Sequence, residues 1–412
     1  YSSTKTDVPA DELTESVSVI GQDEIEQSSA VNVVDLLKEI PGVEVVQTGS
    51  VGSTVSIFMR GGNSSHTLVL VDGIKINSPT TGAVDLCDMT LDGIRRIEIV
   101  RGPMGTLYGS EAMTGVIQIF TAAGPQVEDH VRLGAGSDGI ALGSFAYGTG
   151  EGETGFSLSG SWRQADGFHF ERDDYDGFTA AARYDARAAG GIITLTGRYS
   201  DYDKSLYGFP YLPEDPNRVQ SSESLIAGLA WNRYGDDAHT RVQVSYFDSG
   251  LTDDDPENAA GAGNTYTDID ATVTGIELQH DWYKGRNTFT LGAEYLQREA
   301  DYAYTDAWSN DAYDESNDNT SVFGQWQLRG DGIDFTAAAR YDDNENFGSD
   351  TNFRLGIGGD RASDQLRWWA NYATAFRAPS LNELYYPNWG DPDIEPESSK
   401  GYEIGLWQGL GE

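Results

Sequence analysis

From about residue 130 onward, apolar and polar residues alternate with a period of two, and this pattern constrains the fold more than any other feature. In the segment IDFTAAARYD, Ile333, Phe335 and Tyr341 share one face, while Asp334 and Arg340 share the other. Successive side chains of a β-strand point to opposite faces, so each such segment predicts a strand with one apolar face. Roughly fourteen of these segments follow one another. The region is therefore predicted to be mainly antiparallel β-structure.

The connections between these segments are sorted by length. Short links such as YKGRN and RGDG mostly alternate with long ones such as QADGFHFERDDYDG and READYAYTDAWSNDAYDESNDN. Short turns on one rim and long loops on the other are typical of a bacterial outer-membrane β-barrel. A soluble β-sandwich would also alternate its strands, but it has little reason to sort its loops in this way. We therefore expect a transmembrane antiparallel β-barrel.

Charge and composition exclude other classes of protein. The chain carries 66 acidic and 27 basic residues, a net charge of −39 that would repel nucleic acid. The sequence contains no run of 18 apolar residues, so it predicts no membrane-spanning helix. Cys87 is the single cysteine and is expected to be a small core residue, with a reactive thiol as the alternative. No signal peptide opens the chain, so it is either cytosolic or already processed, and the barrel pattern favours the second.

Residues 1–125 follow a different pattern and are expected to form a compact α/β domain, with residues 126–412 forming the barrel part. In QSSAVNVVDLLKEIPGVEV, apolar residues recur near helical spacing, Ser28 or Ser29 is available as N-cap, and Pro41-Gly42 would end the helix. Short strand-like runs follow, including TLVLVDGIKI, IRRIEIVRG and GVIQIFT, separated by Gly, Asn and Asp.

A barrel of fourteen strands would hardly enclose such a domain, whereas barrels of the 22-stranded type have plugged interiors. An open sheet edge in lipid would leave backbone groups unpaired. We therefore expect about eight further strands in a continuation of this chain or in a second chain.

Long blocks of sequence resemble the TonB-dependent outer-membrane receptors. They are LLKEIPGVEV, IFMRGGNSSHTLVLVDGIKIN, IEIVRGPMGTLYGSEAMTGVIQIFT and FRAPSLNELYYPNWGDPDIEPESSKGYEIG. Within that family, similarity is greatest to the cobalamin transporters. The resemblance implies that the first 125 or so residues plug the barrel lumen, and that the glycines between Arg95 and Thr121 allow close backbone packing. A phosphate-binding loop is the competing interpretation, but no Gly-Lys-Ser/Thr follows these glycines.

The resemblance also implies that arginines of the plug pair with glutamates of the barrel. Tyr402, Ile404 and Leu406 would face lipid, which places Glu403 inside the lumen. The expected plug–barrel residues are Arg60, Arg101, Glu403 and, as a second candidate, Glu294. Such pairs can be bidentate and are stronger away from bulk water. The alternative is that these arginines are simply solvated in the lumen.

Two loops of the plug are expected to face the exterior and contact substrate: the first apical loop (47–54) and the second apical loop (77–85). Their polar groups would suit the amide-rich rim of a corrin, although ordinary polar turns would look similar. Aromatic residues of the long loops could close over a ligand, or serve as loop packing and interfacial residues. The candidate substrate-binding residues are Gln47, Ser50, Ser53, Thr54, Ser78, Thr80, Thr81, Tyr207, Tyr211, Tyr302, Trp308 and Trp389.

Acidic clusters in two long loops predict a calcium site, because hard carboxylate oxygens favour Ca²⁺. The candidate ligands are Asp166, Asp173, Asp174, Asp176, Asp253, Asp254 and Asp255. Similarity to the cobalamin transporters implies calcium-ordered extracellular loops. The EF-hand pattern is not met, since Arg172 and Arg183 occupy positions that do not fit it. A solvated acidic surface is the alternative, and no catalytic cofactor is expected.

The resemblance predicts active import of cobalamin or a related corrinoid across the bacterial outer membrane. A TonB-type inner-membrane protein would supply energy through the N-terminal segment, although no convincing TonB box precedes YSSTKTDVP. A receptor for a ferric siderophore or haem is the alternative, and a passive structural or adhesive barrel is the third hypothesis. Most ferric siderophores are anionic, so acidic loops would repel them. The five histidines are scattered without a catalytic spacing, so we expect no enzyme.

Overall fold

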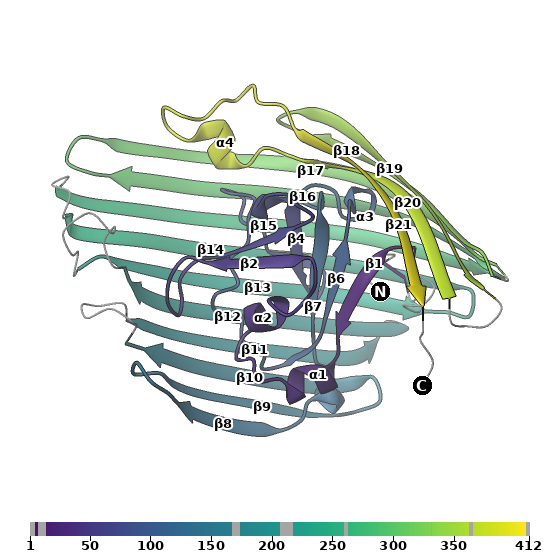
Figure 1. The fold of residues 1–412 in the computed structure, drawn as a ribbon, viewed down its shortest axis with the longest axis horizontal. Coiled ribbons are helices and arrows are strands. Elements are labelled where there is room, and N and C mark those ends of the chain that lie inside the picture. Colours follow the sequence, from purple (N-terminus) through teal and green to yellow (C-terminus); the bar gives the residue numbers. More distant parts are fainter. Residues whose placement is uncertain are drawn as a thin grey trace.

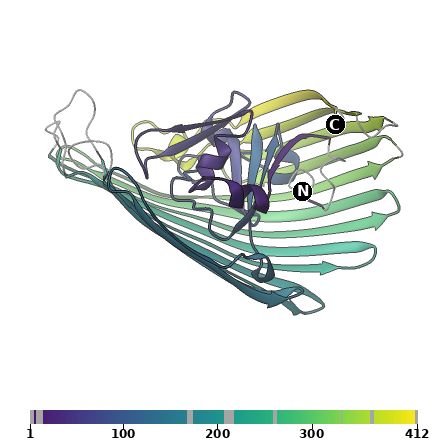
Figure 2. The ribbon, with the colours of Figure 1, turned by 60° about the horizontal axis from the view of Figure 1, so that its bottom comes forward.

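The computed structural model describes residues 5–6, 14–166, 174–206, 217–258, 263–330, 332–361 and 366–408. A fourteen-stranded sheet accounts for most of them, and an N-terminal unit lies on its concave side (Figures 1 and 2). No helix within these ranges has both the length and the apolar character needed to cross a membrane.

The large sheet is antiparallel throughout, and its strands follow chain order. Its strands are β8 (His130–Ala135), β9 (Ala141–Glu151), β10 (Thr154–Ala165), β11 (Tyr175–Ala188), β12 (Gly191–Ser205), β13 (Val219–Tyr234), β14 (Ala238–Asn258), β15 (Gly263–Lys284), β16 (Asn287–Thr305), β17 (Asn310–Arg329), β18 (Asp334–Asn344), β19 (Gly348–Arg361), β20 (Leu366–Arg377) and β21 (Glu397–Gln408). The predicted fourteen strands are confirmed. Among the described residues, β8 and β21 end the strand order without pairing to each other, and the eight further strands stay a prediction.

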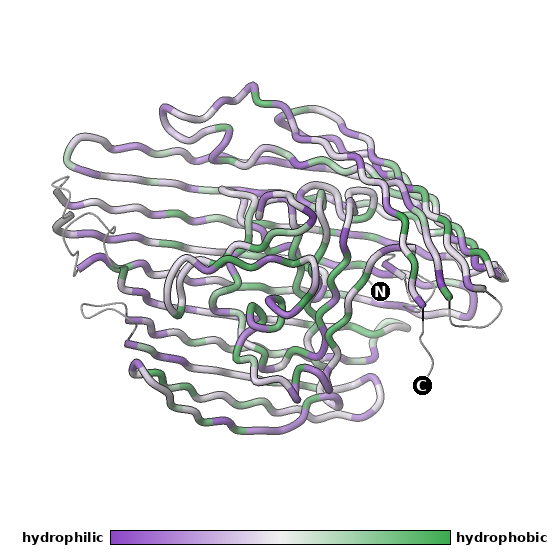
Figure 3. Tube along the Cα trace, in the orientation of Figure 1, coloured by the Kyte–Doolittle hydropathy of each residue, from purple (hydrophilic) through white to green (hydrophobic). Residues whose placement is uncertain are grey.

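The strands are amphipathic, as the period-two pattern predicts. In β16, Phe289 and Leu291 on the outer face are 42% and 56% exposed, whereas Thr290 between them is 4% exposed. Figure 3 shows the same alternation of hydrophobic and hydrophilic residues along many strands. The outer face is therefore apolar over much of its area, and the inner face contacts the N-terminal unit.

The described part of the N-terminal unit contains two small sheets and three short α-helices. A five-stranded sheet has the order β1-β6-β7-β4-β5, in which only β4 and β7 are parallel, and a second sheet pairs β2 with β3. These elements are β1 (Ser16–Ile20), α1 (Gln22–Gln27), α2 (Val33–Leu37), β2 (Val43–Gln47), β3 (Val55–Met59), β4 (Thr67–Val71), β5 (Ile74–Lys75), β6 (Ile94–Arg101), α3 (Gly105–Tyr108) and β7 (Gly115–Thr121).

The predicted helix start is wrong. Ser28 is the C-cap of α1, and α2 begins later because Asn32 accepts a hydrogen bond from the backbone N–H of Asp35. The Asp35 side chain bonds back to the Asn32 backbone, completing a capping box. This reciprocal cap satisfies two backbone donors that a serine cap further upstream would leave open.

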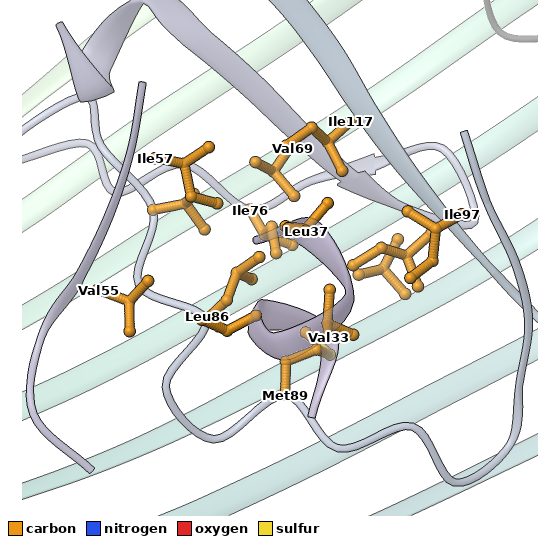
Figure 4. Packing of buried hydrophobic residues seen from close by; sticks show 14 of the residues in the cluster. Val33, Leu37, Val55, Ile57, Val69, Ile76, Leu86, Met89, Ile97 and Ile117 are labelled. Atoms are coloured by element: carbon orange, nitrogen blue, oxygen red, sulfur yellow. The ribbon is translucent and has the colours of Figure 1, made fainter. Parts of the chain in front are cut away.

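The core of the unit is formed by α2 and the small sheets. Val33 and Leu37 of α2 belong to one buried cluster with Ile57, Val69 and Ile117 of the strands (Figure 4). Cys87 belongs to the same buried cluster, which confirms that it is a core residue.

Two glycines of the segment between Arg95 and Thr121 allow close approach to the large sheet. A Cβ on Gly105 would lie 2.8 Å from the Cα of Ala375, and one on Gly109 would lie 2.8 Å from the Arg340 guanidinium. Side chains at these positions would push the unit off the wall. The glycines therefore permit packing within the protein, as predicted.

Candidate functional site

A cavity of about 290 Å³ lies between the two apical loops and the inner face of β12–β15. It occupies the half of these strands next to the long connections, such as the one that follows Ser205. Its polar lining includes Thr54, Ser56, Ser78, Thr80, Thr81, Ser200, Gln220, Ser222, Ser224 and Ser249. Its apolar lining includes Ile76, Met89, Tyr202, Phe247, Leu251 and Ile269. The cavity therefore offers uncharged hydrogen-bonding groups beside apolar surface.

Charged groups are few on this lining. Arg198 supplies a cation, and its guanidinium donates to the carbonyl and hydroxyl oxygens of Thr90 at 3.5 and 3.2 Å. Asp85 and Asp88 supply carboxylates. Because Arg198 is buried and already bonded to the plug, the lining is poorly suited to a highly anionic ligand.

Asp85 joins the end of the second apical loop to the start of β3, directly after the first apical loop. Its Oδ1 accepts hydrogen bonds from the backbone N–H of Val55 at 3.1 Å and of Cys87 at 3.0 Å. Asp85 is exposed where it borders the cavity, but plug atoms close around the carboxyl partly desolvate it and raise its pKa to about 6 against the effect of both N–H groups. Sequence reasoning missed this residue. An Asp that bonds the N–H two residues later is a recognisable turn signal, but the bond to Val55 is not local.

The predicted substrate residues of the plug divide into two groups. Thr54, Ser78, Thr80 and Thr81 line the cavity. Gln47, Ser50 and Ser53 lie in the first apical loop without lining it. The Gln47 amide donates to the Ser50 carbonyl at 2.7 Å, and the Ser50 hydroxyl accepts from Lys204 of β12, so both stabilise the loop.

Of the predicted aromatic residues that the structure describes, Tyr302, Trp308 and Trp389 are not among the lining residues of the cavity. Tyr302 is buried in a tyrosine cluster on the wall, whereas Trp308 and Trp389 are 75% and 86% exposed. Tyr207 and Tyr211 lie outside the described residues. The sequence pattern could not separate these cases, because aromatic residues serve packing and binding alike.

The predicted calcium ligands are spread over two regions. Asp166, Asp174 and Asp176 are exposed, and Asp173 lies outside the described residues. Asp253 accepts two hydrogen bonds from Arg218, at 2.8 and 2.6 Å, Asp254 is exposed, and Asp255 is buried. Within the described ranges, no group of three or more His, Cys, Asp or Glu side chains could hold a metal ion. The calcium site stays a prediction.

The structure brings one predicted plug–barrel pair together. Nη2 of Arg60 lies 2.5 Å from Oε2 of Glu403, whose other oxygen accepts a hydrogen bond from Trp369 at 2.8 Å. Arg101 lies near enough to Glu403 to interact with its charge, but its hydrogen bonds are made within the plug. Its guanidinium donates to the hydroxyls of Ser16 and Ser18 in β1, because β1 pairs with β6 and places Ser16 opposite Arg101.

Glu294 also contacts the plug, but its partner there is a lysine. Its carboxylate lies 2.7 Å from the Lys75 ammonium and 2.7 Å from the guanidinium of Arg340, a barrel residue. Burial lowers the pKa of Lys75, and Glu294 opposes that effect. Sequence reasoning missed Lys75, although a lysine in the short apolar hairpin TLVLVDGIKI is a usable signal. Further plug–barrel ion pairs are Lys5–Glu277, Glu15–Arg354, Asp72–Arg183 and Glu111–Arg298, and the His66 ring lies 3.1 Å from the Glu397 carboxylate.

A curved antiparallel sheet with an apolar outer face, holding an ion-paired α/β unit against its inner face, defines the class of plugged outer-membrane receptor barrels. Comparison with known families agrees. Residues 9–116 match the TonB-dependent receptor plug domain, and residues 133–409 match the TonB dependent receptor-like β-barrel. The chain belongs to the TonB-dependent receptors of the bacterial outer membrane. This is a family of transport receptors and not of enzymes.

Two curated relatives are vitamin B12 transporters named BtuB. The one from Photobacterium profundum is 33% identical over 417 residues, and the one from Vibrio vulnificus is 30% identical over 400 residues. Each alignment covers 95% of this chain and 64% of the relative. The chain therefore spans less than two thirds of the length of these relatives.

Solved structures show the same fold at low identity. A mutant ferric enterobactin receptor of Pseudomonas aeruginosa (PfeA), in complex with enterobactin, aligns with a TM-score of 0.78 at 17% identity, over 97% of this chain and 71% of that one. The copper transporter OprC aligns with a TM-score of 0.76 at 19% identity, over 96% and 69%. At such identities these likenesses show the fold alone.

Proposed function

We propose that this chain belongs to a receptor that imports cobalamin or a related corrinoid across the outer membrane. The carrying observation is the cavity beneath the apical loops, lined by hydroxyls, one amide and apolar side chains. A corrin presents neutral amides on its rim and apolar faces between them. The polar lining could therefore bond the amides, and the apolar lining could contact the faces. The two BtuB relatives support the same substrate class.

A ferric siderophore receptor is the second candidate, because receptors for siderophores share the fold. The charges disfavour it. Asp85 and Asp88 border the cavity, its cation Arg198 is bonded to Thr90, and the whole chain carries a net charge of −39. An anionic iron chelate would meet repulsion without a free cation on this lining.

We also propose that a TonB-type inner-membrane protein energises the receptor through its N-terminal segment. Supporting this, the Lys5 ammonium lies 2.6 Å from Glu277, in the half of β15 that leads to the short turn before β16. Short turns face the periplasm in barrels of this class, so the position of Lys5 toward that side supports contact with a periplasmic partner. Calcium bound by the acidic residues around 166–176 and 253–255 is a further proposal, supported by their charge density.

Titration with cyanocobalamin, beside a panel of ferric siderophores, tests the substrate. We expect saturable binding of cyanocobalamin and none of the siderophores. Ser222→Phe would place a large ring in the cavity from β13 and displace the ligand from part of its contact surface. We expect this loss of contacts to weaken cyanocobalamin binding at least about tenfold. Ser221→Phe is the matched control, because the neighbouring side chain points to the outer face and should leave binding unchanged. Binding of a siderophore and not of cyanocobalamin would refute the proposal.

A further inference from the structure

The segment after β20 touches the second apical loop directly. We name residues 377–386 the α4 segment, since they contain α4 (Leu381–Tyr385; Figure 1). The backbone N–H of Leu381 donates to the Pro79 carbonyl at 2.9 Å, and that of Asn382 donates to the Thr80 carbonyl at 3.2 Å. The first N–H groups of a helix have no acceptor within the helix, so they are available for these bonds.

The second apical loop receives this support at its tip in addition to its own bonds. Its base is closed by its own bonds, from the Ser78 N–H to the Ala83 carbonyl and from the Gly82 N–H to the Ser78 carbonyl, both 2.8 Å. The carbonyls of Pro79 and Thr80 at the tip accept from the α4 segment instead. The position of the tip is therefore set partly by a barrel element.

The α4 segment is in turn fixed to the barrel wall by tyrosines. The Tyr313 hydroxyl of β17 donates to Oδ1 of Asn382 at 2.5 Å, and the hydroxyls of Tyr302 and Tyr386 lie 2.8 Å apart. The rings of Tyr302 and Tyr313 stack with centroids 5.4 Å apart. These contacts bury the tyrosine cluster between the barrel strands and α4, and they hold the α4 segment against the wall.

Other bonds brace the start of the segment. Arg377 donates to both carboxylate oxygens of Glu383, at 2.8 and 2.7 Å, and Ser380 caps the helix in a capping box with Glu383. The Ala378 N–H donates to the Ser110 hydroxyl of the plug at 2.9 Å. The segment therefore joins plug and wall as a preformed unit.

Thr80 lines the cavity and its hydroxyl bonds that of Ser78, which also lines it, whereas Tyr313 and Asn382 are not among the lining residues. We infer that Tyr313 and Asn382 are positioning residues for the ligand: through the α4 segment they hold the tip of the second apical loop at the cavity. This inference rests on the proposed function, because it assumes that the cavity receives the substrate.

Tyr313→Phe and Asn382→Ala test the inference in the full chain. Each removes one side of a single hydrogen bond and leaves the lining intact, so each should weaken cyanocobalamin binding about fivefold. The KM of uptake should rise by a similar factor with an unchanged maximal rate. Tyr304→Phe is the matched control, since this neighbouring hydroxyl of β16 donates to Asp306 and not to the α4 segment.

Hydrogen–deuterium exchange without ligand separates this inference from the substrate proposal. Tyr313→Phe should speed exchange in residues 77–85, and Tyr304→Phe should not. If the wild-type chain binds no corrinoid, the proposed function fails, and faster exchange would still support the mechanical link. The inference is overturned if both variants bind and exchange like wild type, or if they lower only the maximal uptake rate.

Discussion

Single residues decide how firmly the plug is held. Arg60 is largely exposed in its pair with Glu403, with 41% of its side chain accessible, whereas the side chains of Lys75 and Glu294 are 9% and 8% accessible. Exposed pairs gain little net free energy, because water and mobile side chains compete with the contact. Removing one partner of a buried pair leaves a charge without compensation and costs far more.

Lys75→Met should therefore destabilise the plug more than Arg60→Ala. We expect Lys75→Met to lower the free energy of unfolding of the plug by about 3 kcal/mol. This value is at the low end for a broken buried ion pair, because Arg340 still bonds Glu294. For Arg60→Ala we expect about 0.5 kcal/mol. Cys87, the one cysteine and buried in the plug, reports plug opening through thiol labelling in urea, while tryptophan fluorescence reports the barrel. Equal shifts in labelling for both variants would contradict the ranking.

The role of a single residue could be predicted from the sequence where it depends on neighbours along the chain, and not where it depends on distant segments. Glu403 was placed in the lumen because alternation along one strand fixes its face. Lys75, Asp85 and Tyr313 were missed because their partners come from distant segments, which no local pattern relates. The bonds from Arg101 to Ser16 and Ser18 could not be predicted for the same reason, since the pairing of β1 with β6 lies outside any short stretch of sequence.

At the scale of elements, the strands were predictable and the helices less so. Period-two alternation identifies a half-buried strand from a few residues. The start of α2 depends on which of several polar residues caps it. Asn32 is the N-cap because it forms a reciprocal bond with Asp35. The apical loops could be located from the sequence, yet the cavity beneath them depends on strands β12–β15 and could not.

Asp85, which joins the second apical loop to β3, should make the stability of the plug depend on pH. Its pKa is about 6 in the fold and ordinarily 3.8, so the folded state binds the proton more tightly. The tighter proton binding contributes to the free energy of unfolding fully below pH 3.8, and this contribution is lost as pH rises through 6. Asp85→Asn stays neutral and keeps its acceptor, so calorimetry should show it slightly more stable than wild type at pH 8 and by less at pH 5, the gain being small because Asp85 is exposed to solvent. A gain that is the same at both pH values would contradict the assignment.

At the scale of the whole molecule, the excess of acidic residues is concentrated partly in rows across the outer face. Strand register places Asp270 opposite Asp301 and Asp301 opposite Asp314. Their neighbours Ala271 and Tyr302 are buried against the lumen side, so the three carboxylates lie on the outer surface. They occupy the half of β15–β17 next to the connections at 259–262 and 306–309, beyond much of the apolar outer surface. Like charges directly opposite each other destabilise a sheet.

Asp301→Asn should relieve this repulsion at the centre of the row. In 20 mM salt we expect the unfolding temperature to rise on the order of 1 °C, because the neutral amide removes both cross-strand contacts between like charges. In 0.5 M salt the gain should disappear, since screening shortens the reach of exposed charges to a few ångströms. Asp343→Asn is the matched control on the same outer face, because its cross-strand partners are Thr320 and Ser349. A gain that persists at high salt, or that Asp343→Asn reproduces, would show that the row does not carry the effect.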